Sequence, residues 1–188
     1  MNRYLLLTII TVISAILQLP QIQATVIWHA TLIEQGEWWR ILTGNFTHTN
    51  VTHLIMNMAA LWIITYLFRP TASSLLFILI SSAIFVGGSL LFDNLTIYAG
   101  LSGVLHSIFA YYALCEALSG RRSSWLLVIG VIAKIAYEQW FGPSSSTAAL
   151  IEANVAIEAH LAGGVFGTTC AILVNLSRKW SLINKPRK

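Results

Sequence analysis

The chain alternates between long apolar runs and short polar connections. The runs lack the every-second-residue alternation of membrane β-strands, and each approaches the roughly 20 residues that cross a hydrocarbon core as a helix. Because unpaired backbone groups are destabilising in lipid, an all-α bundle is the expected architecture. The sequence predicts one domain over residues 1–188 with six transmembrane helices, at Tyr4–Leu19, Val51–Phe68, Leu75–Phe92, Leu101–Leu118, Trp125–Trp140 and Val155–Leu176.

Composition agrees with an integral membrane protein. Of the 188 residues, 56% are hydrophobic and 10% are charged, which is too apolar for a soluble domain of this size. The net charge of +4 comes mostly from the C-terminal basic residues, which suit anionic lipid headgroups and give no indication of nucleic-acid binding. Cys115 and Cys170 lie deep in apolar runs and are expected to be free thiols.

The basic residues predict the orientation of the bundle. Apart from Lys134 inside the fifth run, all of them except Arg40 lie on one face if the chain crosses six times: Arg3, Arg69, Arg121, Arg122, Arg178, Lys179, Lys185, Arg187 and Lys188. An excess of Lys and Arg marks the cytoplasmic face, so both termini are expected there. The first run could instead be a cleaved signal peptide, but no convincing small-x-small site follows it, and a retained helix is favoured.

Candidate chemistry begins at Ser102, at the start of the fourth run. Gly100 and Gly103 leave its hydroxyl open to a substrate backbone and permit a tight turn into the helix. The first turn of a helix has unpaired N–H groups and the positive end of the dipole, which favour an oxyanion beside that hydroxyl. Taken alone, this pattern is more typical of close helix packing, so residues elsewhere must decide.

Polar residues on two other runs are expected at a similar depth. His53 and Asn57 are four residues apart and share one face at the outer end of the second run. His160 precedes Gly163 and Gly167, whose spacing lets another helix approach closely. Interhelical hydrogen bonding is the structural alternative for each residue by itself. Together they complement Ser102 as a base and two oxyanion donors.

The base could come from either of two histidines. His106 lies one turn below Ser102 on the same face and is a real rival. His160 is preferred because it comes from an adjoining helix at a shallower level, close to a water-filled outer cavity. His106 would then lie beneath His160 and bond its other ring nitrogen, setting its tautomer.

We expect a Ser–His dyad and not a triad, because no carboxylate is predicted beside these residues. The sequence has neither a His-Glu-x-x-His zinc motif nor an aspartate inside a predicted helix, so no metal and no cofactor are expected. Lys134 is expected to extend toward the surface or to pair with Glu138 one turn further along.

The longest connection, from Pro20 to Asn50, is unusually aromatic. We expect it to lie partly in the outer leaflet and to brace the bundle, with Arg40 as an anchor that bonds loop carbonyls. Its rings suit the membrane interface: Trp28, Trp38, Trp39 and Phe46.

These motifs together resemble the rhomboid intramembrane serine proteases over about the whole six-helix core. The resemblance implies that Ser102 is the nucleophile and His160 the general base, while His53, Asn57 and the Ser102 N–H bind the oxyanion. Many rhomboids carry a tyrosine where this chain has His106. The matching motifs are Trp39-Arg40, His53-x-x-x-Asn57, Gly100-x-Ser102-Gly103, and His160 followed by Gly163-x-x-x-Gly167.

The run from Gly100 to His106 is similar to the rhombosortase branch, in which glycine normally stands at the position of Ser107. That branch is linked with exported bacterial proteins whose C-terminal tail has a glycine pair, a hydrophobic helix and a basic cluster. The resemblance implies a serine endopeptidase of the bacterial inner membrane that cleaves this tail near the periplasmic face. Its partners would be the transmembrane segment of a protein substrate and membrane lipid.

Two other classes of protein are alternatives to a protease. The first is a catalytically inactive rhomboid-fold protein that binds transmembrane helices, although the presence of both Ser102 and His160 argues against it. The second, a transporter or channel, ranks lower because the runs show no obvious repeat and their polar groups cluster at one depth.

Overall fold

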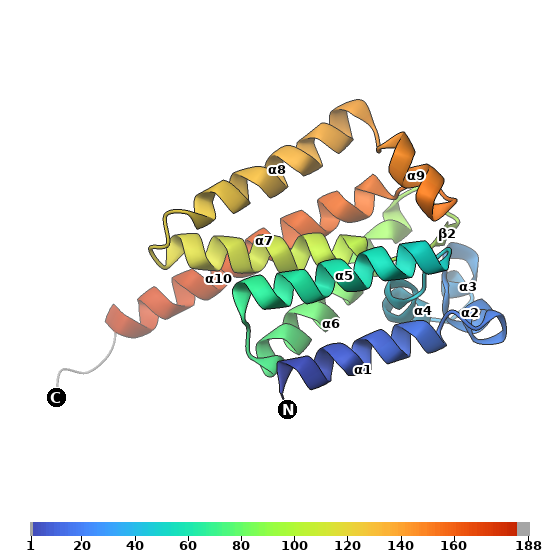
Figure 1. Cartoon of the computed structure of the whole chain (residues 1–188), viewed down its shortest axis with the longest axis horizontal. Helices are drawn as coiled ribbons and strands as arrows, with labels where there is room; N and C mark the ends of the chain where they lie inside the picture. Colours follow the sequence, from blue (N-terminus) through green and yellow to red (C-terminus); the bar gives the residue numbers. More distant parts are fainter. Residues whose placement is uncertain (1, 184–188) are drawn as a thin grey trace.

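One helix, α7 (Ser102–Leu118), occupies the centre of the molecule (Figure 1). The structure is a computed structural model and describes residues 2–183. The basic residues Lys185, Arg187 and Lys188 of the predicted cytoplasmic cluster therefore lie outside the described residues. The helices in contact with α7 are α5 (Val51–Phe68), α6 (Ala72–Ser89), α8 (Ser124–Phe141) and α10 (Ile157–Ile183).

The first helix, α1 (Arg3–Ile16), packs against α5 and α6. It ends at Ile16, before the predicted end at Leu19, and the chain then bends by 102° into α2 (Pro20–Val26). Pro20 takes the first helical position, where the missing N–H would have had no partner. The bend therefore follows from a proline that can start a helix but cannot continue one.

The aromatic connection is folded and packs on α6. It contains α2, β1 (Trp28–His29), α3 (Ala30–Glu34), α4 (Trp39–Thr43) and the 3-10 helix η1 (Gly44–Phe46). β1 pairs antiparallel with β2 (Ile97–Tyr98), so that Trp28 lies opposite Tyr98.

Two of the tryptophans in this connection differ from the third in their surroundings. Trp38 and Trp39 are 62% and 52% exposed, whereas Trp28 is fully buried and donates its indole N–H to the Gly87 carbonyl at 2.8 Å. The prediction of an interfacial ring at Trp28 is wrong, because this indole finds its hydrogen-bond partner inside the protein.

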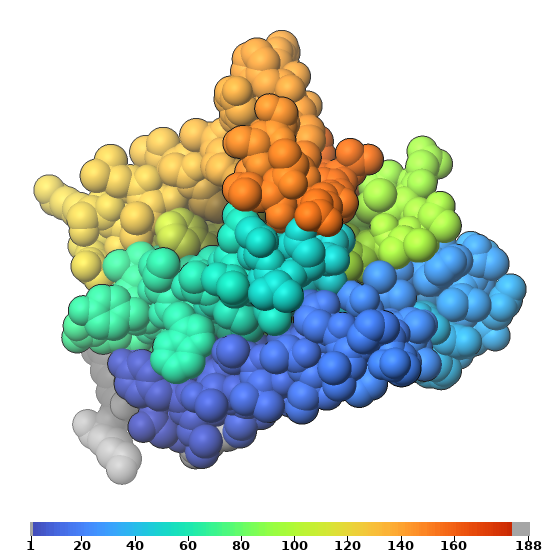
Figure 2. Space-filling view, turned by 45° about the vertical axis from the view of Figure 1, so that its right-hand side comes forward, coloured from blue at the N-terminus to red at the C-terminus, as the bar shows by residue number. Residues whose placement is uncertain are grey.

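The remaining predicted runs are helical, with small shifts at their ends. α6 begins at Ala72 and continues into the 3-10 helix η2 (Leu90–Phe92), while α5 has the predicted bounds. The connection after α8 holds a further short helix, α9 (Ser145–Ile151), which lies between the fifth and sixth predicted runs. Figure 2 shows this segment, in orange, seated against the first turns of α5, in cyan.

The protein is a multi-pass membrane protein by the length and composition of its helices. Among the described residues, three helices meet both criteria by themselves, at Val51–Phe68, Ala72–Phe92 and Ile157–Ser181, and the bent pair α1 and α2 meets them jointly. α7 has 17 residues, and Lys134 and Glu138 lower the hydropathy of α8. Six crossings and cytoplasmic termini accordingly stay predictions.

Candidate active site

Ser102 is the first residue of α7, held there by the turn before the helix. Gly100 has φ +132°, a conformation that side chains rarely adopt, and the Tyr98 hydroxyl donates to its carbonyl at 2.6 Å. Burial raises the pKa of Tyr98, so its hydroxyl stays a donor. Pairing of β2 with β1 fixes the position of Tyr98 itself. The serine hydroxyl is thus presented at a helix start where first-turn N–H groups lack helical partners.

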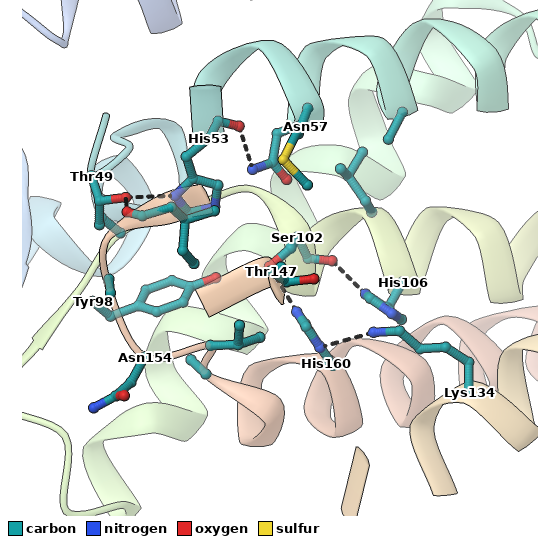
Figure 3. A pocket seen from close by; sticks show the side chains of 18 of the residues that line it. Thr49, His53, Asn57, Tyr98, Ser102, His106, Lys134, Thr147, Asn154 and His160 are labelled. Carbon is teal, nitrogen blue, oxygen red and sulfur yellow. Dashed lines mark hydrogen bonds between the residues drawn. The ribbon is translucent and has the colours of Figure 1, made fainter. Parts of the chain in front are cut away.

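His160 comes from the first turns of α10 and faces this serine across a hydrogen bond. Its Nε2 lies 2.8 Å from Ser102 Oγ (Figure 3). A Cβ added at Gly163 would clash with the Gly103 carbonyl, and one added at Gly167 would clash with the Ser107 carbonyl. The two glycines therefore let the α10 backbone lie directly on α7, which sets the distance between His160 and Ser102.

His106 lies against the face of the His160 ring. The two rings are stacked, with centroids 4.2 Å apart and an interplanar angle of 22°. His106 Nδ1 lies 2.7 Å from the Ser102 carbonyl, which can only accept, so this nitrogen carries the proton and donates. The expectation that His106 bonds the other ring nitrogen of His160 is wrong, because that nitrogen is occupied from α8.

A carboxylate from α8 lies behind His160. Glu138 Oε2 is 2.8 Å from His160 Nδ1, and the Lys134 ammonium is 2.6 Å from the same oxygen. The prediction of a dyad with no carboxylate beside it is therefore wrong as a description of the geometry. His160 is hydrogen-bonded to Ser102 through one ring nitrogen and to Glu138 through the other. Lys134 and Glu138 are paired as the sequence allows, but the pattern did not reveal that this face of α8 turns toward α10.

The candidate oxyanion donors lie on α5, on the other side of the pocket from His160 (Figure 3). Asn50 caps this helix by accepting from the His53 N–H at 2.8 Å. Asn57 donates one amide hydrogen to the His53 carbonyl at 3.0 Å, which leaves the second hydrogen of its NH₂ group for another acceptor. Gly100 packs so closely on the His53 ring that a Cβ there would clash with it.

The hydrogen bonds of the Thr49 hydroxyl indicate which ring nitrogen of His53 carries the proton. The Thr49 hydroxyl lies 2.5 Å from the Ile151 carbonyl and 3.1 Å from His53 Nδ1. A carbonyl only accepts, so the single hydroxyl proton goes to Ile151 and His53 Nδ1–H donates to Thr49. In the neutral ring His53 Nε2 then has a lone pair and no proton. His53 is consequently not an oxyanion donor in this arrangement, although its position suits the role.

His48 is a neighbour of this site that the sequence did not single out. It is fully buried, and its ring meets His53 edge-on with centroids 5.0 Å apart. Burial, and secondarily the nearby His53, lower the pKa of His48 to about 3. Its position next to the cap of α5 was the signal available in the sequence.

These side chains open into one cavity of about 740 Å³. Ser102, His160, His53 and Asn57 line it, together with apolar residues from α5 and α7. The cavity is large enough for an extended peptide segment, and its few polar groups converge on Ser102.

Arg40 lies away from this cavity, inside the folded connection. Its side chain is buried and donates to the carbonyls of Ile27 at 2.7 Å and Ala24 at 3.1 Å, and it pairs with Glu37 at 2.6 Å. Arg40 thus holds the connection together and does not line the cavity that contains Ser102 and His160.

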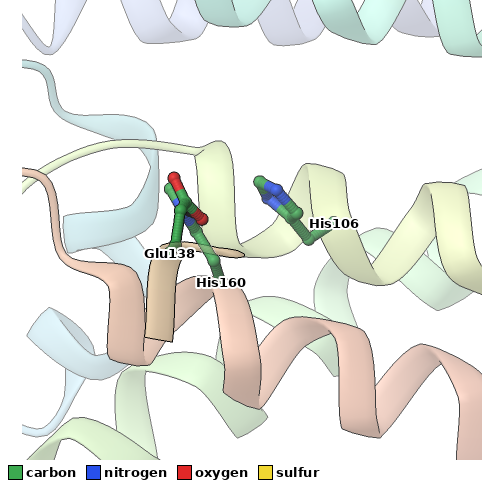
Figure 4. A group of neighbouring side chains, drawn as sticks. All are labelled: His106, Glu138 and His160. Carbon is green, nitrogen blue, oxygen red and sulfur yellow. Dashed lines mark hydrogen bonds and ion pairs between the residues drawn. The ribbon is translucent and has the colours of Figure 1, made fainter. Parts of the chain in front are cut away.

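His106, Glu138 and His160 also form a group of three possible metal ligands, with one ligand atom of each within 4.8 Å of the others (Figure 4). The two rings are stacked, so their in-plane lone pairs run side by side and do not converge. Both nitrogens of His160 and Nδ1 of His106 are engaged in hydrogen bonds. The geometry suits a hydrogen-bonded chain better than a metal centre, and the absence of a metal stays a prediction.

The fold and this site define a class: multi-pass helical membrane proteins that hold a serine and a histidine together in a pocket within the bundle. The chain belongs to the rhomboid family, because the family model described as Rhomboid domain matches residues 35–177. It is also similar to Rhomboid protease GluP of Bacillus subtilis (strain 168), with 30% identity over 152 residues, or 79% of this chain. The chain spans 28% of the length of that curated relative.

Proposed function

We propose that the protein is an intramembrane serine protease. The observation that carries the proposal is the 2.8 Å contact between Ser102 Oγ and His160 Nε2 at the wall of the cavity. Membership of the rhomboid family and similarity to a protein named as a rhomboid protease support it.

In the proposed reaction Ser102 Oγ attacks the carbonyl carbon of the scissile peptide and gives its proton to His160 Nε2. The tetrahedral oxyanion accepts hydrogen bonds from the Ser102 N–H and from the free amide hydrogen of Asn57, with His53 as a further donor once its Nε2 is protonated. His160 then protonates the leaving amine as the C–N bond breaks. Water, deprotonated by His160, attacks the acyl-enzyme and releases Ser102 and a new carboxyl terminus.

The proposed substrate is the C-terminal tail of exported proteins, with its glycine pair, hydrophobic helix and basic cluster. Support comes from the sequence run Gly100 to His106, which resembles the rhombosortase branch. The proposed location is the bacterial inner membrane, with six crossings, cytoplasmic termini and the cavity toward the periplasm. The apolar lining of the cavity suits a hydrophobic segment.

Co-expression with a protein that has such a tail, read by mass, tests the activity. We expect a shortened product with the wild-type chain and none with Ser102→Ala, which should insert and fold because only one oxygen is removed. Near-normal cleavage by Ser102→Ala would rule out the serine mechanism. An unrelated transmembrane substrate, cleaved equally well, would contradict the tail preference and leave the protease proposal standing.

The inactive, helix-binding alternative makes the opposite prediction. In that case the wild-type chain would retain the tail protein in a pull-down from detergent without shortening it, and a fluorophosphonate probe would fail to label Ser102. A labelled Ser102 in the wild type, lost in His160→Ala, would exclude the alternative.

A further inference from the structure

The hydrogen bonds that begin at Ser102 continue beyond His160. Behind its imidazole lie Glu138, with a side chain 11% exposed, and Lys134, both on the last turns of α8. We propose that Glu138 is a positioning residue that fixes the tautomer of His160, and that Lys134 holds the Glu138 carboxylate in place. This inference rests on the proposed protease function.

The tautomer argument follows from what each group can donate. A carboxylate oxygen only accepts, so its 2.8 Å contact with His160 Nδ1 requires that Nδ1 carry the proton. The neutral ring then has its lone pair on Nε2, which faces Ser102 Oγ at 2.8 Å. Only this tautomer can accept the serine proton, so the carboxylate selects the form of His160 that can act as a base.

Lys134 makes the selection necessary. Its ammonium lies 3.2 Å from His160 Nδ1 as well as 2.6 Å from Glu138 Oε2. An ammonium only donates, so without the carboxylate it would donate to Nδ1 and shift the ring proton to Nε2. The ring would then donate to Ser102 and could not accept from it. Glu138 therefore excludes a competing state that its own helix neighbour would otherwise stabilise.

The charges around His160 are consistent with this assignment. His106 from α7 covers one face of the ring through a stack and has its own proton on the Nδ1 that meets the Ser102 carbonyl. When His160 takes up the serine proton, the adjacent carboxylate offsets the new positive charge in a buried site, where few waters could do so. Lys134 meanwhile neutralises Glu138 in the resting state.

Three variants at two positions test the proposal, with kcat and KM measured per folded molecule. Glu138→Gln keeps the volume but removes the charge, and we expect kcat to fall by about 10²-fold or more with KM little changed. Glu138→Asp, which keeps the carboxylate, should recover part of that loss. Adding Lys134→Met to Glu138→Gln should raise kcat above that of Glu138→Gln, because the donor that forces the wrong tautomer is gone.

Glu34→Gln is the matched control, since Glu34 is an exposed carboxylate at the end of α3 and does not line the cavity. It should leave kcat unchanged. A folded Glu138→Gln with wild-type kcat, or a double variant no faster than Glu138→Gln, would overturn the inference. An inactive wild-type chain, or an active Ser102→Ala, would instead contradict the proposed function, so the two failures are distinguishable.

Discussion

At the scale of single residues, the two histidines near Ser102 have different atoms free for chemistry. His160 offers Nε2 to the hydroxyl, while the Nδ1 of His106 donates to the Ser102 carbonyl. His160→Ala should therefore abolish cleavage. His106→Tyr should keep measurable activity, because a phenol ring can replace the stack on His160 without supplying a base. Product formation by each purified variant checks this, and an active His160→Ala would mean that the base is misassigned.

Asn57 provides a second test at this scale. One hydrogen of its amide is used by the His53 carbonyl and the other is available to the cavity. Asn57→Ala should lower kcat by about 10²-fold or more, with KM nearly unchanged, if that hydrogen binds the oxyanion only in the transition state. Asn154→Ala is the control, because Asn154 also lines the cavity but points away from Ser102 in Figure 3. Equal losses in both variants would argue against the donor role.

His48 predicts how stability depends on pH. Its pKa of about 3 in the folded protein lies below the unfolded value of 6.5. The unfolded chain therefore binds the extra proton first, so the contribution of neutral His48 is fully present above about pH 6.5 and decreases as the pH falls toward 3. The slope from this one group is at most about 1.4 kcal/mol per pH unit. The temperature of thermal inactivation in detergent, measured between about pH 7 and about pH 5, should depend less on pH in His48→Gln than in the wild type.

The sequence was most informative about residues whose role depends on spacing along one helix. Ser102 with Gly103, and His53 with Asn57, could be paired because positions on one helix have a known geometry. Glu138 could not, since its partner is on another helix and a mostly apolar α8 gives no periodic signal for the face that turns inward. The tautomer at His53 depends on Ile151, far away in the chain, and so was equally hidden.

At the scale of helices, the contact between α7 and α10 depends on glycines that leave no room for a side chain. Gly163→Ala should destabilise the protein by about 1–3 kcal/mol, because the new methyl group would clash with the backbone carbonyl of Gly103. Gly88→Ala on α6 is the matched control. It has open space around it and should be neutral or slightly stabilising, as alanine favours a helix more than glycine does. Thermal unfolding in detergent should show a lower midpoint for Gly163→Ala than for Gly88→Ala. Similar midpoints would contradict the close packing of α10 on α7.

The helices themselves were largely predictable from apolar runs, whereas the connection between α1 and α5 was not. Its short elements depend on partners far along the chain, such as the Gly87 carbonyl that receives the Trp28 indole N–H. Composition alone predicts that those aromatic rings lie at the membrane interface. Tertiary hydrogen bonding decides which of them enter the core.

At the scale of the whole molecule, the predicted number of crossings can be tested on α8. Ser123 lies just before α8, and Ser146 lies in α9, beyond the other end of α8. Both are exposed, and neither lines the cavity. In a chain with Cys115 and Cys170 replaced by alanine, Ser146→Cys should react with an impermeant maleimide on cells with a permeable outer membrane. Ser123→Cys should react only after the inner membrane is opened. Labelling of both from one side would contradict the six-helix topology.

The single hydroxyl proton of Thr49 connects the seating of α9 with the state of the oxyanion site. While α9 lies on α5, Thr49 donates that proton to the Ile151 carbonyl, and His53 keeps its own proton on Nδ1, the nitrogen that meets Thr49. If a substrate displaces α9, Thr49 is free to donate to Nδ1, and the His53 proton can move to Nε2. In the proposed protease, the oxyanion site would thus be one donor short until a substrate displaces α9. Such a protease would discriminate by the rate of turnover more than by affinity, because a molecule that leaves α9 seated would bind and be cut more slowly.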